Sequence, residues 1–372
     1  MTGISPSNPP QSPVHEAAEA ATNTAPVEVD TRPVNDSDST LSSEISTYTA
    51  SLTSSVLNYP TEFGRQYHAY NADSYNFPND EAERERLDLT HLLITKGIGN
   101  RLFLAPVDLN RSARVLDIGT GTGIWAICVG EEYPSAEIIG NDLSAIQPTW
   151  VPPNVKFEVD DVEQPWVHDK FDYIFSRYMS TSILDWPKLV ENVFEHLHPG
   201  GWAEFQDFDL LYYSEDGSIT DDHHLLKWMK LFIDTARTKL NREPCPGPRL
   251  EGWIRHAGFT NVVHRKFRLP LGSWPKDPQL KDIGMCNIAQ LLEGLEAFSL
   301  KIFCGVLGMP TDEVLVMLAQ IRQDRMLAST TLCLISMLYM ARNHNFQLSL
   351  DGSDRIPPLL LMSQATNPFQ QV

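Results

Sequence analysis

The stretch Val115-Leu-Asp-Ile-Gly-Thr-Gly-Thr-Gly-Ile124 joins a short apolar run to three alternating glycines. The apolar run predicts a buried β-strand at Arg114–Ile118, and a helix is expected to follow the glycines. Gly119, Gly121 and Gly123 permit positive φ and carry no Cβ atom, so a ligand can lie directly against the backbone. In a doubly wound sheet, ligands bind at the carboxyl ends of the strands, which is where this turn falls.

Two common glycine loops do not fit this stretch. A phosphate-binding P-loop requires Gly-Lys-Ser/Thr, and the stretch contains no lysine. The dinucleotide fingerprint Gly-x-Gly-x-x-Gly fails because Gly121 is followed two residues later by Gly123 and then by Ile124. A nicotinamide-linked oxidoreductase on a similar sheet is therefore the weaker alternative.

The sequence after the turn alternates short apolar runs with segments of helix length, which is typical of a parallel sheet covered on both faces. The clearest helix has an apolar stripe from Trp186 to Leu197 and is ended by His198-Pro-Gly-Gly201. Trp125 is expected to pack the helix after the turn against the sheet. The runs that predict strands are Arg114–Ile118, Glu137–Gly140, Val155–Val159, Phe171–Phe175, Trp202–Phe205 and Thr260–Phe267.

Two acidic sites follow the glycine turn, each after a predicted strand. Glu137-Ile-Ile-Gly-Asn-Asp142 is a strand that ends in a carboxylate, and Phe157-Glu-Val-Asp-Asp161 is another. An acid in the place of Asp142 accepts hydrogen bonds from both ribose hydroxyls and repels a 2′-phosphate, which suits an adenosine-containing cofactor. We therefore expect the turn and these acids to surround one ligand.

The composition favours an intracellular globular protein that does not bind nucleic acid directly. The chain has 372 residues, 42% of them apolar, and a formal net charge of −19, whereas phosphate binding depends on clustered Lys and Arg. No apolar run approaches the ~20 residues of a membrane helix, and the N-terminus lacks the pattern of a secretory signal. The five cysteines are scattered and odd in number, which indicates reduced, mostly buried thiols and no metal site.

The spacing Asp117-x-Gly-x-Gly-x-Gly123 resembles motif I of the class I methyltransferases that use S-adenosylmethionine. The resemblance implies an α/β fold with a doubly wound, mostly parallel, Rossmann-like sheet of seven strands and helical lid elements. It also implies that Asp117 helps to hold the methionine amino group. Asp161, or Asp160 as the alternative, is implied beside the adenine amino group, with Val162 near the ring. The cofactor-binding residues implied in this way are Asp117, Gly119, Gly121, Gly123, Asp142, Asp160, Asp161, Val162 and Tyr67.

Further motifs resemble a narrower group, the fungal LaeA-like methyltransferases. Tyr67-His-Ala-Tyr70 and Trp150-Val-Pro-Pro153 are far more specific than the glycine loop, and the resemblance extends over roughly residues 58–325. This group includes regulators of secondary metabolism and enzymes of small-molecule and peptide biosynthesis. The resemblance implies that Tyr67 and His68 fold over the cofactor as part of a lid. The remaining motifs are Gly64–Tyr70, Pro78–Asp80, Asp117–Trp125, Ile139–Ser144, Ile146–Pro153, Asp160–Val162, Asp185–Pro187 and Leu197–Trp202.

The methyl acceptor is expected above the carboxyl ends of the fourth and fifth strands, where Arg177, Tyr178 and Gln206 would line its pocket. The methyl group of the cofactor is electrophilic, so the enzyme mainly has to align a nucleophile with it. A base is required only when the acceptor must lose a proton early. His68 and Asp207 are the candidates for that base. The alternatives are that His68 orients the lid by hydrogen bonding and that Asp207 is only a hydrogen-bond acceptor in a loop.

The chain divides into a tail, one domain and a second tail. Residues 1–55 are rich in Ser, Thr, Pro and Ala and cannot bury enough apolar surface to offset the entropy of ordering, which predicts a disordered segment. Residues 56–340 are the predicted methyltransferase domain, and 341–372 are an atypical C-terminal tail. Within the domain we expect N-terminal lid helices over 56–110, the cofactor-binding core over 111–210, and acceptor-pocket helices with the last strands over 211–340.

The end of the chain departs from the LaeA-like group, which usually closes with a short Val-Tyr-Gly-like strand soon after the last long helix. Here that place is taken by the apolar run Thr331–Met340 and a polar tail. Three possibilities follow: this run supplies the seventh strand, another segment replaces it, or the strand is absent.

These features predict an S-adenosylmethionine-dependent methyltransferase that acts on a small molecule or peptide of fungal secondary metabolism. The alternative is a LaeA-like regulator that controls secondary metabolism through protein partners. The enzyme is expected in the cytoplasm and the regulator in the nucleus. Neither needs a membrane or direct contact with nucleic acid.

Overall fold

The computed structural model describes residues 58–70, 75–214, 216–217, 219–324 and 331–344. The expected N-terminal tail, residues 1–55, and residues 345–372 of the expected C-terminal tail lie outside the described residues. Within the described part, no helix is long and apolar enough to cross a membrane. The cysteines are free thiols, as expected, but only Cys245 and Cys333 are buried, and the other three are half-buried.

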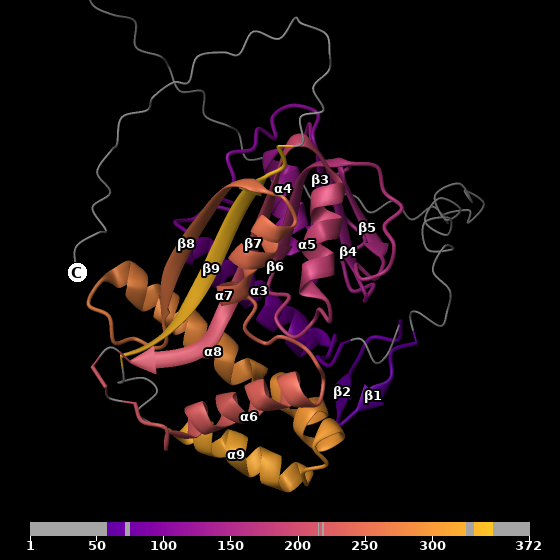
Figure 1. Cartoon of the computed structure of the whole chain (residues 1–372). Helices are drawn as coiled ribbons and strands as arrows, with labels where there is room; N and C mark the ends of the chain where they lie inside the picture. The colour runs from indigo at the N-terminus through magenta and orange to yellow at the C-terminus, as the bar shows by residue number, and fades with distance from the viewer. Residues whose placement is uncertain (1–57, 71–74, 215, 218, 325–330, 345–372) are drawn as a thin grey trace, which may run out of the picture. The chain divides into compact units, whose positions relative to one another are not determined.

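A seven-stranded sheet forms the centre of the described domain, in the order β5-β4-β3-β6-β7-β9-β8 (Figure 1). The pairs between the first five strands of that order are all parallel, and β9 runs antiparallel to both of its neighbours. The prediction of a doubly wound, mostly parallel sheet of seven strands is confirmed. The strands are Arg114–Ile118 (β3), Glu137–Asp142 (β4), Val155–Val159 (β5), Phe171–Arg177 (β6), Leu197–Ser214 (β7), Thr260–Pro270 (β8) and Leu332–Arg342 (β9).

The seventh strand comes from the apolar run near the end of the domain, the first of the three possibilities left open by the sequence. β9 lies between β7 and β8, and nearly every one of its residues is buried. A strand with neighbours on both edges and helices on its faces has little contact with water, which explains why Thr331–Met340 reads as a continuous apolar run.

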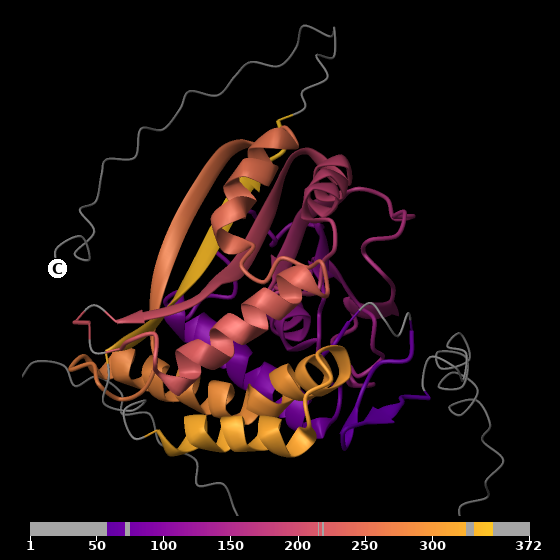
Figure 2. The ribbon, with the colours of Figure 1, turned by 60° about the horizontal axis from the view of Figure 1, so that its bottom comes forward.

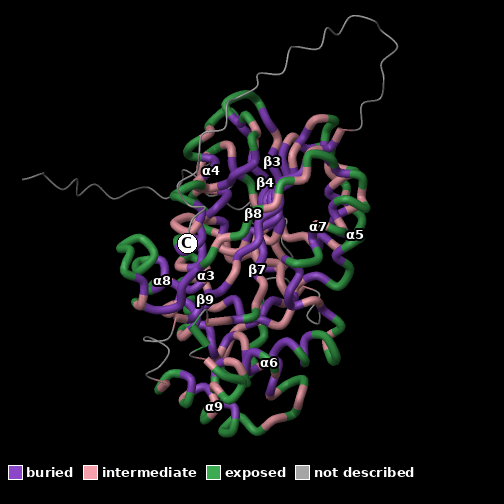
Figure 3. The backbone as a smooth tube through the Cα atoms, turned by 60° about the vertical axis from the view of Figure 1, so that its left-hand side comes forward, coloured by how far each residue is buried: buried purple, intermediate pink, exposed green. Residues whose placement is uncertain are grey.

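Helices cover both faces of the sheet. Those of one face are α5 (Trp186–Glu195) and α7 (Gly247–His256), and those of the other are α3 (Glu81–Gly97) and α4 (Ile124–Glu132). Trp125 of α4 stacks on Phe175 of β6, with ring centroids 3.9 Å apart and planes at 3°, and its Nε1 donates to the carbonyl of Leu102. The prediction that Trp125 packs its helix against the sheet is confirmed. Figure 3 shows the central strands β3 and β4 as continuously buried segments.

A second layer of helices lies beyond the carboxyl ends of the parallel strands. Figure 2 shows α6, α8 and α9 grouped at that end, below the sheet, with α3 running beside α8. These elements are α6 (His224–Thr238), α8 (Pro278–Ser299), the π-helix η1 (Leu300–Val306) and α9 (Thr311–Gln323).

The segment before α3 is fastened to the start of that helix. β1 (Thr61–Glu62) and β2 (Arg65–Gln66) form a short hairpin. The Arg65 guanidinium donates Nε and Nη2 to the two carboxylate oxygens of Asp80 at 2.6 and 2.7 Å, and Asp80 also accepts from the backbone N–H of Glu83 as the N-cap of α3. This bidentate pair fixes the hairpin close to the carboxyl end of the sheet.

Candidate functional site

The turn after β3 has the conformation that its glycines predict. Gly119, Gly121 and Gly123 all have positive φ, at 65°, 59° and 81°. A Cβ at Gly119 would clash with the side chain of Met179, and one at Gly123 would clash with the ring of Phe157. The first and third glycines are therefore needed for packing as well as for backbone conformation. Gly121 has more room, because its Cβ would meet only a methyl group of Leu87 at 3.6 Å.

A cavity lies over this turn, and we name it the glycine-turn cavity. It is bordered by the ends of β3, β4, β5 and β6 and by α3, so that five segments of the chain meet around it. Its lining residues are Tyr75, Leu87, Thr90, His91, Gly119–Thr122, Ile124, Asn141–Leu143, Asp160–Glu163, Arg177–Met179, Ser182 and Ile183. The structure thus brings together the turn and the acids after two further strands, as the sequence led us to expect.

Asp142, at the end of β4, is held directly across the turn. Its Oδ2 accepts from the backbone N–H of Gly121 and its Oδ1 from that of Ser144, both at 2.9 Å. Burial raises the pKa of Asp142 to about 6, although the bonds from these N–H groups oppose that rise. The carboxylate is therefore fixed in orientation and ionised at neutral pH.

The two acids after β5 connect the neighbouring strand ends. The N–H of Asp160 donates to the carbonyl of Asp142 at 3.0 Å, and Oδ1 of Asp160 accepts from the N–H of Asp161. Asp161 accepts in turn from the N–H of Glu163 at 3.0 Å. Val162 is buried beside them, so this wall of the cavity offers two acids and one apolar side chain.

Asp117 of β3 does not line the cavity. It is buried below the turn, where its Oδ2 accepts from the hydroxyl of Thr120 at 2.6 Å. Burial raises the pKa of Asp117 to about 7, and the bond from Thr120 and the charge of Arg177 lower it. Gly123 is likewise outside the lining, as the N-cap residue of α4. Both residues support the turn from beneath in this geometry.

Arg177, expected in the acceptor pocket, lines the glycine-turn cavity instead. Its Nη2 donates to Nδ1 of His91 on α3 at 2.8 Å, and its buried Nη1 has no hydrogen-bond partner in the structure. Burial, together with the charge of Arg177, lowers the pKa of His91 to about 3, so this imidazole is a neutral acceptor. The cavity therefore contains a fixed guanidinium with an unused N–H group.

His91 was not singled out as a site residue from the sequence. Leu87, Thr90 and His91 recur at helix spacing, which indicates a packed helix face, and all three line the glycine-turn cavity. A buried histidine on such a face carries no signal of its own until its partner is known. That partner, Arg177, is on a strand far away in the sequence.

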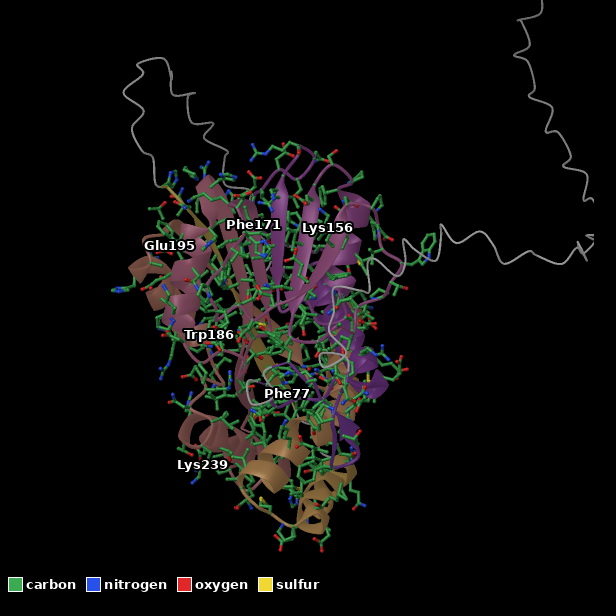
Figure 4. All side chains as sticks on the ribbon, turned by 90° about the vertical axis from the view of Figure 1, so that its right-hand side faces the viewer. Phe77, Lys156, Phe171, Trp186, Glu195 and Lys239 are labelled. Carbon is green, nitrogen blue, oxygen red and sulfur yellow. The ribbon has the colours of Figure 1, made fainter. Side chains whose placement is uncertain are left out.

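A second cavity adjoins the first, and we name it the aromatic cavity. The two share Tyr75, Leu87, Thr90, Tyr178 and Ser182. Figure 4 shows Phe77, one of its lining residues, between the carboxyl edge of the sheet and the second layer of helices. The other lining residues are Arg86, Ser180, Thr181, Phe208, Leu210, Tyr212, Trp228, Met229, Phe232, Gln290, Leu291, Phe298 and Leu334.

His68 and Asp207, the two candidates for a base, line neither cavity. The ring nitrogens of His68 lie 2.7 Å from the carbonyl oxygen of Tyr70 and 3.1 Å from that of Tyr75, and burial lowers its pKa. Asp207 accepts from the N–H of Phe208 at 2.8 Å, and burial raises its pKa to about 7. This geometry favours the orienting role for His68. Asp207 is a hydrogen-bond acceptor for the backbone, but it lies within β7 and not in a loop.

Tyr67 and Gln206 are also outside both linings. Tyr67 is fully buried with the ammonium of Lys301 4.6 Å from its ring centroid. Gln206 is buried within β7, and its Nε2 donates to Glu204 Oε1 at 2.7 Å. Of the residues expected in the acceptor pocket, Tyr178 alone lines the aromatic cavity.

Comparisons show that this chain is similar to known methyltransferases and to a regulator of secondary metabolism. A family model described as a methyltransferase domain matches residues 89–264. Methyltransferase pytC of Aspergillus terreus is 47% identical over 278 residues, which cover 74% of this chain and 85% of that protein. Secondary metabolism regulator LAE1 of Cochliobolus heterostrophus is 37% identical over 244 residues, covering 64% of this chain and 79% of that one. Phosphoethanolamine N-methyltransferase 2 of Haemonchus contortus, solved with S-adenosyl-L-methionine, has a TM-score of 0.39 and 18% identity over 68% of this chain and 52% of that one.

Proposed function

This chain belongs to the S-adenosylmethionine-dependent methyltransferases, and we propose from that premise that it methylates a small molecule or peptide of fungal secondary metabolism. The observation that carries the proposal is the junction of two cavities. One has a glycine turn and acids that suit an adenosine-containing cofactor, and the other adjoins it and shares Tyr75, Leu87, Thr90, Tyr178 and Ser182 with it. A methyl donor and its acceptor need adjoining sites of this kind, because transfer requires the two to be held in line.

The residues present fit the cofactor. The carboxylate of Asp142 is the acceptor for the ribose hydroxyls, and Asp161 and Val162 are the partners of the adenine ring. The backbone at Gly121, where a Cβ would meet only a methyl group of Leu87, leaves room for the methionine portion. We assign the unused N–H of Arg177 to the methionine carboxylate, since guanidinium groups bind carboxylates well. The bound cofactor supplies an electrophilic methyl group on its sulfonium.

The protein's own contribution to transfer is positioning. Arg86 is the one charged residue among those that line the aromatic cavity, and it is already paired with Glu83. That lining contains no carboxylate or imidazole, so the proposal includes no general base from the described residues. Orientation alone supplies a large part of such a barrier, with effective molarities of about 10⁵–10⁸ M in well-aligned reactions.

A regulatory role is the second candidate, because LAE1 is described as a secondary metabolism regulator and is 37% identical to this chain. Under that proposal the protein acts through protein partners, in the nucleus. Under the first it acts in the cytoplasm on a metabolite.

Two experiments test the proposal. Calorimetry on the full chain should detect S-adenosylhomocysteine binding and no NAD binding, and the reverse would overturn the cofactor assignment. Deletion of the gene in its host, followed by metabolite profiling, separates the two candidates. Loss of one methylated product with accumulation of its unmethylated precursor indicates the enzyme, whereas silencing of many pathways indicates the regulator.

A further inference from the structure

The aromatic cavity defines the class of acceptor. Resting on the proposed function, we propose that the acceptor is an uncharged, flat and largely apolar small molecule, and that neither a peptide backbone nor a lysine or arginine side chain enters this site. The proposal depends on the aromatic walls and on the one charged group and the hydrogen-bonded polar groups that border the cavity.

The walls are aromatic faces from distant parts of the chain. Tyr178 and Phe208 form a parallel stack with centroids 4.1 Å apart and planes at 6°, which presents a flat surface at the junction with the glycine-turn cavity. Phe77, Trp228 and Phe232 continue the wall on the helix side. Such faces bind flat rings by stacking or edge contact, and they gain little from a flexible polar chain.

The one charge on the wall is already neutralised. Arg86 donates Nε and Nη2 to the carboxylate of Glu83 at 3.0 and 2.6 Å, and both side chains are buried. Its Nη1 donates to Thr90 and Gln290 at 3.2 and 3.4 Å. The guanidinium lies 4.8 Å from the ring centroid of Phe298. An anionic acceptor would have to compete with Glu83, and a cationic one would find no counter-ion on this wall.

Three further polar groups that border the cavity donate to protein partners. The indole N–H of Trp228 donates to Ser299 Oγ at 2.8 Å, Gln290 Nε2 donates to Asn287 Oδ1 at 3.1 Å, and the Ser180 hydroxyl donates to the carbonyl of Pro244 at 2.6 Å. A peptide brings one N–H and one C=O per residue, and burying them without partners is unfavourable. A charged side chain is excluded more strongly, because an unpaired buried ion loses its hydration.

Three probes test the acceptor class by calorimetry on the full chain with S-adenosylhomocysteine present. They are 2-naphthol, which is uncharged, 2-naphthoate, which carries a carboxylate on the same ring system, and N-acetyl-lysine amide, which carries an ammonium group. We expect 2-naphthol to bind at least tenfold more tightly than either charged probe. Equal or tighter binding of 2-naphthoate or of the lysine amide overturns the inference. Absence of S-adenosylhomocysteine binding would instead reject the proposed function, so the two failures are distinguishable.

Variants at Met229, buried on the cavity wall, locate the binding. Met229→Lys should weaken 2-naphthol binding at least tenfold and strengthen that of 2-naphthoate, whereas Met229→Leu should leave both within threefold of the unchanged protein. Asp234→Lys, on the exposed side of the same helix, is the control for added charge. The temperature of unfolding and the S-adenosylhomocysteine affinity verify that each variant folds. Should a folded Met229→Lys bind both naphthalenes as before, the probes bind elsewhere and the assignment of the cavity is wrong.

Discussion

Replacing Asp142 by asparagine tests the cofactor site with the least change in shape. The carboxylate accepts two backbone N–H groups, those of Gly121 and Ser144, at 2.9 Å each. An amide of the same size has one oxygen, so one of these N–H groups would face the Nδ2 donor. Leaving a buried donor unpaired costs about 1–3 kcal/mol, and the free energy of unfolding should fall by that amount.

The effect on cofactor binding should be larger than the effect on stability. Hydrogen bonds to a charged group contribute about 1.5–3 kcal/mol each, and two from the ribose hydroxyls give about 3–6 kcal/mol. Since about 1.4 kcal/mol is a factor of ten, Asp142→Asn should weaken S-adenosylhomocysteine binding by about 10²–10⁴-fold. Calorimetry gives the Kd, denaturant titration gives the stability, and the exposed Asp169→Asn is the control. A folded Asp142→Asn protein that binds within threefold of the unchanged protein would refute the ribose assignment.

Three more predictions concern pH, charge and packing. Because burial raises the pKa of Asp142 to about 6, the ionised acceptor is present above pH 6 and is lost below it. S-adenosylhomocysteine affinity should accordingly fall by up to about tenfold per pH unit below pH 6, and a flat calorimetric profile between pH 5 and 7.5 would contradict this. Arg177→Met should weaken S-adenosylhomocysteine binding at least tenfold but leave the Kd of its decarboxylated analogue within threefold; equal losses for the two ligands would show that no carboxylate is bound there. Trp125→Ala removes a stack at 3.9 Å and should lower the free energy of unfolding by about 3–5 kcal/mol in denaturant titration, whereas a loss below 1 kcal/mol would mean that the surrounding core closes over the gap.

Short strands of the parallel part of the sheet were predictable, both inside the sheet, where β3 is buried, and at its edge, where β5 is partly exposed. Arg114–Ile118 and Val155–Val159 agree with β3 and β5 residue for residue. β7 was predicted only over Trp202–Phe205, yet it extends from Leu197 to Ser214. Its later residues begin with Asp207 and Asp209 on either side of Phe208, and they are held in the sheet by pairing with β9, from Asp209 opposite Ile335 to Ser214 opposite Leu332. Such pairing is decided by a segment more than a hundred residues away.

The functional site was also predictable only in part. Its glycine turn and strand-end acids are local motifs, so the sequence alone located them. The direction of a side chain at a strand end is not local, because Arg177 turns toward α3 to donate to His91 and leaves Tyr178 facing the acceptor side. The aromatic cavity was predicted only in outline, because acceptor-pocket helices were expected over 211–340 and Tyr178 was expected to line the pocket, but its other members were not identified. Its members look like ordinary core residues in each segment, and only the fold brings them around one space.

The same cavity bears on the choice between enzyme and regulator. A protein that acted only through partners would need an exposed surface, and it would gain nothing from an enclosed space with aromatic walls beside its cofactor site. A core that served stability alone would be filled, because close packing is favourable and empty volume in an interior is costly. Here Phe208, Trp228 and Phe232 border a cavity that adjoins the glycine-turn cavity, and Tyr178 lines both. Such unfilled volume beside the donor site favours catalysis on an apolar acceptor over a purely regulatory role.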